Sequence, residues 1–204
     1  MVNGKWARAH IDTGATATVI DSGFARRRKL DMISSEVGET KYANSVTVKI
    51  GSSTFETGDF TKVQPLNNVN SDPAFKSDII LGYDLLSQVE WQISVTRGGM
   101  RISCSGSVTI PRAIPVNTSF EDRRIFLTVY VDGVKLDRTL LDTGSGFDID
   151  LPKATADRLK LAPTTDMATS WIEDDIVTEY EPRRVCRRLF GLSHAAIGRC
   201  SIMA

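Results

Sequence analysis

The sequence contains the tripeptide Asp-Thr-Gly twice, once in each half of its 204 residues. Asp12 follows the strand-like run of residues 9–11, and Asp142 follows two leucines. Two carboxyl groups a few ångströms apart cannot both ionise, so one stays protonated while the other is charged. Such a pair can activate a water molecule for attack on a peptide carbonyl. The repeat therefore predicts Asp12 and Asp142 as catalytic residues that act together.

The residues after each aspartate suit this chemistry. Glycine permits a tight turn with a close backbone approach, and a threonine hydroxyl can brace the neighbouring loop. A single Asp-Thr-Gly is also typical of a solvated hairpin turn, so the hypothesis depends on the pair. The residues predicted to support the two loops are Thr13, Gly14, Ala15, Thr143, Gly144 and Ser145.

The elements that must position these loops are mainly short strands. Asn3-Gly4 and Asp132-Gly133 are typical of turns between antiparallel strands. Residues 79–81 form a continuous apolar run, which indicates a buried strand. Short helices are predicted over residues 24–30 and 154–161, soon after each Asp-Thr-Gly loop. The two halves therefore share an order of elements as well as a tripeptide.

Two segments carry a resemblance to a known family. Residues 10–20 match the active-site strand and loop of the retropepsin-like family, the retroviral aspartic proteases and their cellular and bacterial relatives. Residues 79–86, Ile-Ile-Leu-Gly-Tyr-Asp-Leu-Leu, are similar to its second signature. The chain resembles a tandem of two such domains. In the family the second signature passes behind the active-site loop and completes a ψ-shaped motif, which here involves Ile80, Leu81 and Gly82.

The resemblance implies an all-β fold with two acid-protease lobes of the closed β-barrel type, related by a pseudo-two-fold axis. It implies an aspartic endopeptidase that binds an extended polypeptide and needs neither a metal nor an organic cofactor. A mobile hairpin, the flap, would close over substrate. The flap candidates are Gly38 and Tyr42 in the first lobe and Trp171 in the second.

The predicted domains are residues 1–104 as lobe 1, 105–119 as a linker and 120–204 as lobe 2. The sequence predicts that the first hairpin lacks its leading strand. Gly82 of the second signature lies 70 residues after Asp12. The position 70 residues after Asp142 would lie beyond Ala204, so lobe 2 is predicted to be incomplete at its end. A weaker match to the second signature occurs at residues 189–192.

Several arrangements follow from these patterns. One chain carries both aspartates, so an intramolecular pair is the economical assembly, and a homodimer that pairs two first lobes is the alternative. A different class of function is a retropepsin fold kept for binding or dimerisation with little proteolysis. A truncated precursor that is active only with flanking segments is a third. Two intact Asp-Thr-Gly triplets favour the protease, because a scaffold needs no paired acid.

Composition excludes several other classes. Basic and acidic residues number 25 each, so nothing points to nucleic acid or an anionic membrane as partner. The three cysteines have neither a zinc-ligand spacing nor an even count, and the two histidines lie in no nucleophile motif.

No apolar run is long enough to span a membrane. The first residues are not a signal peptide, and export to a bacterial cell envelope would require a leader outside this sequence. The basic run at residues 26–29 is interpreted as a solvated face.

Overall fold

A computed structural model describes most of the chain. The described residues are 1–35, 40–67, 76–89, 91–96, 99–104, 116–131, 133–145, 149–160, 168–172, 176–180 and 201–203. The chain divides into two compact units: Met1–Ala113 with Glu121–Arg124, and Ile114–Phe120 with Ile125–Ala204. The predicted lobe and linker boundaries remain a proposal.

The first unit is built from short strands and two helices. The strands are β1 Ala9–Ile11, β2 Val19–Asp21, β3 Met32–Ser34, β4 Lys41–Asn44, β5 Thr47–Ile50, β6 Ser53–Glu56, β7 Phe60–Gln64, β8 Ile79–Leu81, β9 Trp91–Thr96 and β10 Gly99–Cys104; the helices are α1 Ser22–Arg28 and α2 Tyr83–Leu86. Six strands form one sheet in the order β1-β8-β2-β7-β4-β3. The pairs β5-β6 and β9-β10 form separate two-stranded sheets.

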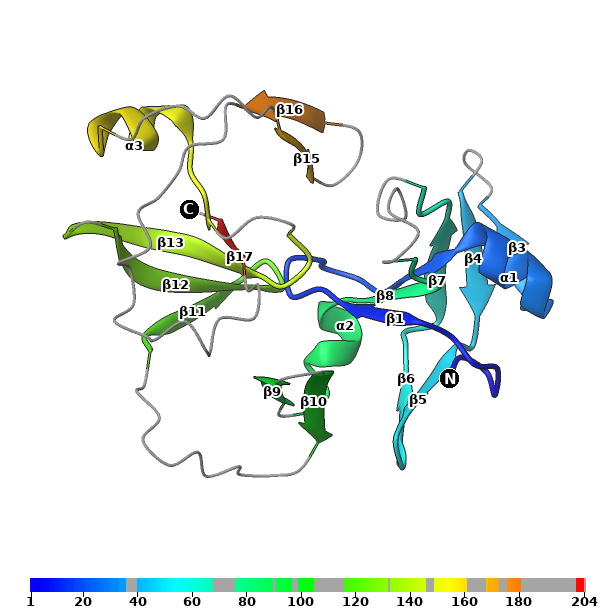
Figure 1. The fold of residues 1–204 in the computed structure, drawn as a ribbon. Helices are drawn as coiled ribbons and strands as arrows, with labels where there is room; N and C mark the ends of the chain where they lie inside the picture. Colours follow the sequence, from blue (N-terminus) through cyan, green and yellow to red (C-terminus); the bar gives the residue numbers. More distant parts are fainter. Residues whose placement is uncertain are drawn as a thin grey trace. The chain divides into compact units, whose positions relative to one another are not determined.

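Strand β8 lies between β1 and β2, although about sixty residues of chain separate it from both. It runs parallel to β1, with Ile11 opposite Leu81, and antiparallel to β2. All three residues of β8 are buried, as expected for an apolar strand paired on both sides. Figure 1 shows β8 alongside β1, with α2 following at once. The predicted buried strand at residues 79–81 is therefore confirmed.

Helix α1 starts at Ser22, directly after its N-cap residue Asp21. The Phe24 N–H donates to Asp21 Oδ1 at 2.7 Å, which satisfies one of the amide groups left open at the start of a helix. Phe24 is buried on the inner side of the helix, which packs on β2 and β7. The helix ends at Arg28, and Lys29 takes a left-handed conformation with φ of 53°. The sequence predicted residues 24–30, so the observed helix lies two residues earlier.

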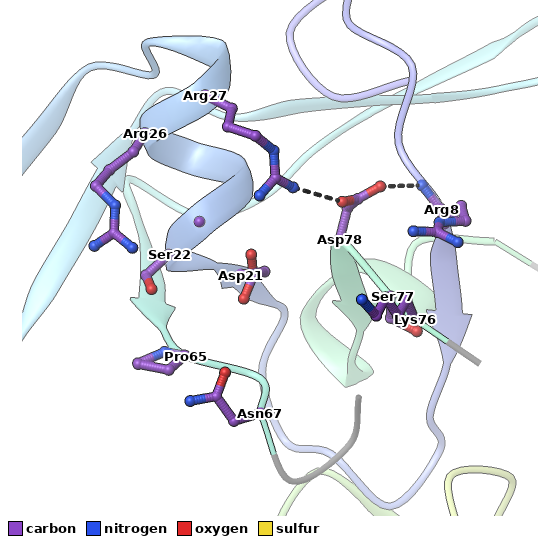
Figure 2. Close-up of a pocket in the computed structure, with 11 residues that line it drawn as sticks. Arg8, Asp21, Ser22, Arg26, Arg27, Pro65, Asn67, Lys76, Ser77 and Asp78 are labelled. Carbon is purple, nitrogen blue, oxygen red and sulfur yellow. Dashed lines mark hydrogen bonds and ion pairs between the residues drawn. The ribbon is translucent and has the colours of Figure 1, made fainter. Parts of the chain in front are cut away.

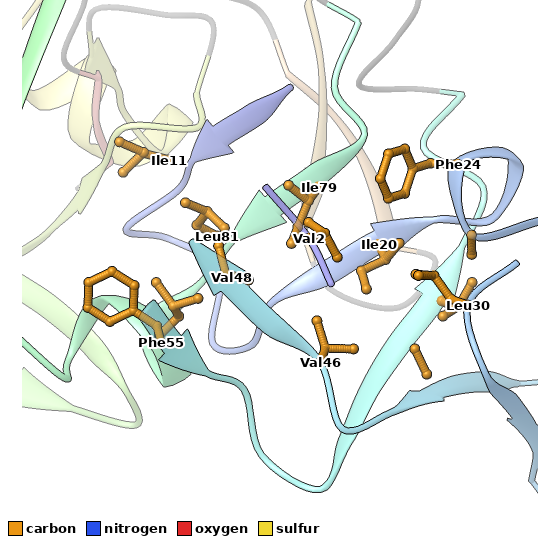
Figure 3. Close-up of a cluster of buried hydrophobic side chains, with 14 residues drawn as sticks. Val2, Ile11, Ile20, Phe24, Leu30, Val46, Val48, Phe55, Ile79 and Leu81 are labelled. Carbon is orange, nitrogen blue, oxygen red and sulfur yellow. The ribbon is translucent and has the colours of Figure 1, made fainter. Parts of the chain in front are cut away.

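One apolar cluster holds the first unit together (Figure 3). Side chains from β1, β2, β4, β5, β6, β7, β8 and both helices meet in it, so the six-stranded sheet, the β5–β6 pair and the helices share one core. Its buried members are Val2, Ile11, Ile20, Phe24, Ala25, Leu30, Ala43, Val46, Val48, Phe55, Val63, Ile79, Leu81 and Leu85.

The second unit, like the first, is built from short strands and a short helix. The remaining strands are β11 Thr118–Glu121, β12 Arg124–Val131, β13 Val134–Asp142, β14 Ile149–Asp150, β15 Ala168–Ile172, β16 Ile176–Tyr180 and β17 Ser201–Met203, with helix α3 at Lys153–Arg158. Five of them form a sheet in the order β11-β12-β13-β17-β14, and β15 pairs with β16. Among the described residues its buried cluster is small, with Val129, Val131 and Leu136 at the centre.

Strand β17 takes the place in the second sheet that β8 takes in the first. It lies between the strand before Asp-Thr-Gly and the strand after it. The directions are reversed, because β17 runs antiparallel to β13 and parallel to β14. The match at residues 189–192 lies outside the described residues, and the incompleteness of the second lobe stays a prediction.

The all-β fold class is confirmed, because strands dominate and the described helices are short. The closed barrel is not observed. In the part of the chain that is described, the six-stranded sheet is open, with β1 and β3 as its two edges. Among the described strands β3 pairs only with β4, whose other side pairs with β7, so β3 is left at the edge.

Phe24→Ala is expected to lower the free energy of unfolding by about 3–5 kcal/mol, because it empties a fully buried site. Urea unfolding followed by circular dichroism measures the change. Phe60→Ala is the matched control, since Phe60 is 60% exposed and should cost at most about 1.5 kcal/mol through its contact with Tyr42. Equal losses for the two variants would contradict this description of the core.

Candidate active-site loops

Asp12 is the first residue after β1, and both its N–H group and its carboxylate bond to backbone groups. Its N–H donates to the Leu81 carbonyl at 3.0 Å, which extends the β1–β8 pairing by one residue. Its Oδ1 accepts from the N–H groups of Gly14 at 2.9 Å and Ala15 at 3.0 Å. Among the described residues Oδ2 accepts no hydrogen bond. One carboxylate oxygen therefore fixes the loop through two backbone N–H groups.

Asp142 has the same local arrangement. It is the last residue of β13, its side chain is buried, and its Oδ1 accepts from the Gly144 N–H at 2.7 Å. This is the counterpart of the bond from Gly14 to Asp12, two residues along the chain in both cases. Thr143 and Ser145 beside it are half-buried. The two tripeptides thus share a bonding pattern as well as a sequence.

A second set of bonds ties the Asp12 loop to α2, and we call it the Thr18–Asp84 clamp. Thr18 donates twice to Asp84 Oδ1, from its N–H at 2.8 Å and its hydroxyl at 2.7 Å. The Gly82 N–H donates to the same hydroxyl oxygen at 3.2 Å. Thr18 is 1% exposed, so these bonds are shielded from water. Nearer the aspartate, the Tyr83 N–H donates to the Ala15 carbonyl at 2.9 Å.

Gly82 is required by space rather than by its backbone angles. A Cβ at this position would lie 2.4 Å from the carbonyl carbon and oxygen of Ala17. Atoms cannot approach so closely, and both partners are backbone, which has little room to move. The loop after Asp12 and the start of α2 are therefore in direct main-chain contact.

The structure brings the predicted loop and ψ-motif residues of the first unit together. Ile80 and Leu81 are buried in β8 directly behind the loop, and Gly82 follows them. Thr13, Gly14 and Ala15 are half-buried in the loop itself. Their assigned roles remain proposals, since position alone does not demonstrate them.

Two of the flap candidates lie on described strands. Tyr42 is a half-buried residue of β4, and its ring meets Phe60 edge to face at 6.4 Å between centroids. Trp171 lies on β15 opposite Val177. Gly38 lies outside the described residues. Tyr42 and Trp171 therefore lie in antiparallel strand pairs, and their role as flap residues stays a prediction.

Thr18 and Asp84 are not among the site residues that the sequence predicts. Thr18 lies within residues 10–20 and Asp84 within residues 79–86, the two segments that carry the family resemblance, but neither pattern indicates that the two side chains meet. The available signal was an acidic residue two positions after a glycine that opens a helix. Its partner is distant in the sequence, so the pairing becomes visible only when the chain is folded.

The resolved pKa shifts of the second unit lie away from these loops. A hydrogen bond from Lys135, joined by one from the Thr128 hydroxyl, lowers the pKa of the Asp137 carboxyl. The same bond to Asp137 raises the pKa of Lys135. Both side chains are exposed at the surface of β13, so this pair is a solvated ion pair of small energetic effect.

The described part of the chain holds no cluster of three or more histidine, cysteine, aspartate or glutamate side chains that could bind a metal ion. None of its helices is long and apolar enough to cross a membrane.

Comparison with known proteins gives one family. Residues 1–88 match the family model of gag-polyprotein aspartyl proteases. The matched span contains the Asp12 loop, β8 and α2, which are the parts joined by the clamp. A search of curated proteins found no match to the chain.

Gly82→Ala is expected to destabilise the first unit by about 1–3 kcal/mol or more, because the added methyl group overlaps the Ala17 backbone. Gly58→Ala is the matched control, since a Cβ there meets nothing within 4 Å. Thermal unfolding of the two variants checks the expectation. A Gly82→Ala protein as stable as Gly58→Ala would show that the close contact does not exist.

Thr18→Val tests the clamp at constant side-chain volume. It leaves the Gly82 N–H buried without a partner and takes one donor from Asp84, at a cost of about 1–3 kcal/mol. Thr18→Ser keeps the hydroxyl and should keep the Gly82 amide protected from hydrogen exchange. Loss of protection in both variants, or in neither, would argue against the clamp.

Proposed function

Residues 1–88 belong to the retropepsin-like family of retroviral-type aspartyl proteases, and from this membership we propose that the chain is an aspartic endopeptidase. The observation that carries the proposal is the matching pair of turns, in which a glycine N–H fixes Oδ1 of Asp12 and of Asp142. A scaffold would need one such turn to close a hairpin, but not the same acid in both halves.

In the proposed mechanism Asp12 and Asp142 share one proton. The ionised carboxylate takes a proton from a water molecule as the water attacks the carbonyl carbon of a peptide bond. The protonated carboxyl donates to the carbonyl oxygen, which gives a tetrahedral diol. Proton transfer to the leaving nitrogen then breaks the C–N bond and yields an acid and an amine.

The remaining site residues support this pair. Thr13 and Thr143 would brace the loops by hydrogen bonds, while Gly14 and Gly144 would leave room for the substrate main chain. Ala15 and Ser145 follow them as loop support.

Substrate would be a polypeptide bound in an extended conformation, with its main chain pairing to flap strands. Tyr42, Gly38 and Trp171 are the flap candidates. The ring of Tyr42 contacts Phe60 edge to face, so in the first unit this side chain links β4 to the neighbouring strand β7.

The two aspartates would meet within one chain or between two chains. In the first case both units contribute to one site. In the second, two copies of the first unit would pair, with two Asp12 side chains, and the second unit would be accessory. The variants below separate these assemblies.

Asp12→Asn is expected to reduce cleavage of casein by about 10²–10⁴-fold, measured from pH 3 to 8. Asparagine keeps an oxygen that can accept from Gly14 and Ala15, so the loop should persist while the acid is lost. Asp142→Asn should have the same effect if the pair is intramolecular. A bell-shaped pH profile in the unmodified protein would report the two macroscopic ionisations of the pair.

Asp59→Asn is the control, since Asp59 is an exposed aspartate of the first unit outside both loops. If Asp12→Asn alone abolishes cleavage, the homodimer of first units is the active form. If the unmodified chain cuts nothing at any pH, the protease proposal fails for this chain. A binding or dimerisation module, or a precursor that needs flanking segments, then becomes the better description.

A further inference from the structure

A polar hollow of about 460 Å³ lies in the first unit (Figure 2). Its walls come from the start of α1, the residue before β1, the end of β7 and the segment that leads into β8. The residues that line it are Arg8, Asp21, Ser22, Gly23, Arg26, Arg27, Pro65, Asn67, Lys76, Ser77 and Asp78. No apolar side chain apart from Pro65 is among them, so the hollow is not suited to an apolar ligand.

The two carboxylates of the hollow are already engaged. Asp21 caps α1 through Phe24 and also accepts from the Leu66 N–H at 3.3 Å. Asp78 accepts from the Arg8 N–H at 2.9 Å and pairs with Arg27 at 3.4 Å (Figure 2). Their charges therefore serve the local fold.

Three basic side chains of the hollow have no acidic partner among the described residues. Arg8, Arg26 and Lys76 make no ion pair with any residue in the described part of the chain. They come from three different segments, and like charges gathered around one hollow repel each other unless an anion lies between them. Figure 2 shows Arg26 beside the Ser22 hydroxyl on α1, with Arg8 and Lys76 on the opposite wall.

We propose that this hollow binds a phosphate-type dianion. Four basic and two acidic side chains leave an excess of two positive charges, which matches the charge of about −1.5 to −2 that a phosphate monoester carries near pH 7. The planar guanidinium groups of Arg8 and Arg26 suit bidentate contacts to phosphate oxygens, and Lys76 adds a point charge. The hollow has room beyond a single phosphate for the group that carries it.

The position of the hollow separates it from the proposed active site. Arg8 precedes β1 and Asp12 follows it, while Lys76 precedes β8 and Gly82 follows it. Because β1 and β8 are parallel, the hollow and the Asp12 loop lie at opposite strand ends, and Arg8 and Asp12 are about 13 Å apart at about 3.3 Å per residue. A bound anion would leave Asp12 accessible, so the inference holds whether or not the chain is a protease.

The test is titration of the full chain with inorganic phosphate by isothermal calorimetry, at fixed ionic strength and pH 7.5. The expected result is saturable binding with an affinity that falls at least tenfold in the Arg26→Gln/Lys76→Gln double variant. Arg28→Gln is the matched control, since Arg28 is on the same helix but does not line the hollow. Arg8→Gln is a second, independent variant, and thermal unfolding checks that each variant is folded.

A phosphoserine peptide in the same titration distinguishes the two sources of the dianion. Tighter binding than inorganic phosphate identifies a phosphorylated side chain, and weaker binding identifies a free phosphate compound. The proposal is overturned if phosphate does not saturate, or if Arg28→Gln weakens binding as much as the double variant. It is also overturned if a glutamate-rich peptide without phosphate binds while phosphate does not.

Discussion

The main-chain contact between Gly82 and Ala17 is the constraint on which the rest of the first unit depends. It brings two segments that are distant in the sequence within the reach of hydrogen bonds. Thr18 and Asp84 can then join, and Tyr83 can bond to Ala15. A loop of seven residues that carries an acid would otherwise have many conformations, and ordering it costs free energy. The buried clamp offsets that cost.

Burial of β8 supplies the force behind this contact. Ile79, Ile80 and Leu81 are buried, and they draw β1 and β2 together on either side. Removal of apolar side chains from water drives this pairing, whereas the polar clamp selects one arrangement of the loop. The hydrophobic cluster and the loop are therefore one structure: a change in the packing of β8 would move the backbone that holds Asp12.

The two halves of the chain differ in how fully they realise this plan. Both have an aspartate whose Oδ1 accepts from a glycine two residues later. In the first half a parallel strand, a glycine contact and a clamp stand behind the loop. In the second, β17 fills the central place with reversed directions. A catalytic pair demands equal precision from both acids, so the support behind Asp142 matters as much to the proposed activity as the acid itself.

The sequence by itself determined the repeat, the all-β class, the strand at residues 79–81 and the helix after Asp12, because these follow from local patterns of apolar, turn and capping residues. The sequence located α1 only to within two residues. The Asp21 cap starts the helix at Ser22, whereas the apolar pattern starts at Phe24. Tertiary structure alone decided that Thr18 meets Asp84, that Gly82 is needed for space, and that the sheet is open. It also gathered Arg8, Arg26 and Lys76 around one hollow, whereas the sequence indicated only that residues 26–29 form a solvated face. These contacts join residues that are far apart in the chain, and no local pattern encodes which distant segments will be neighbours.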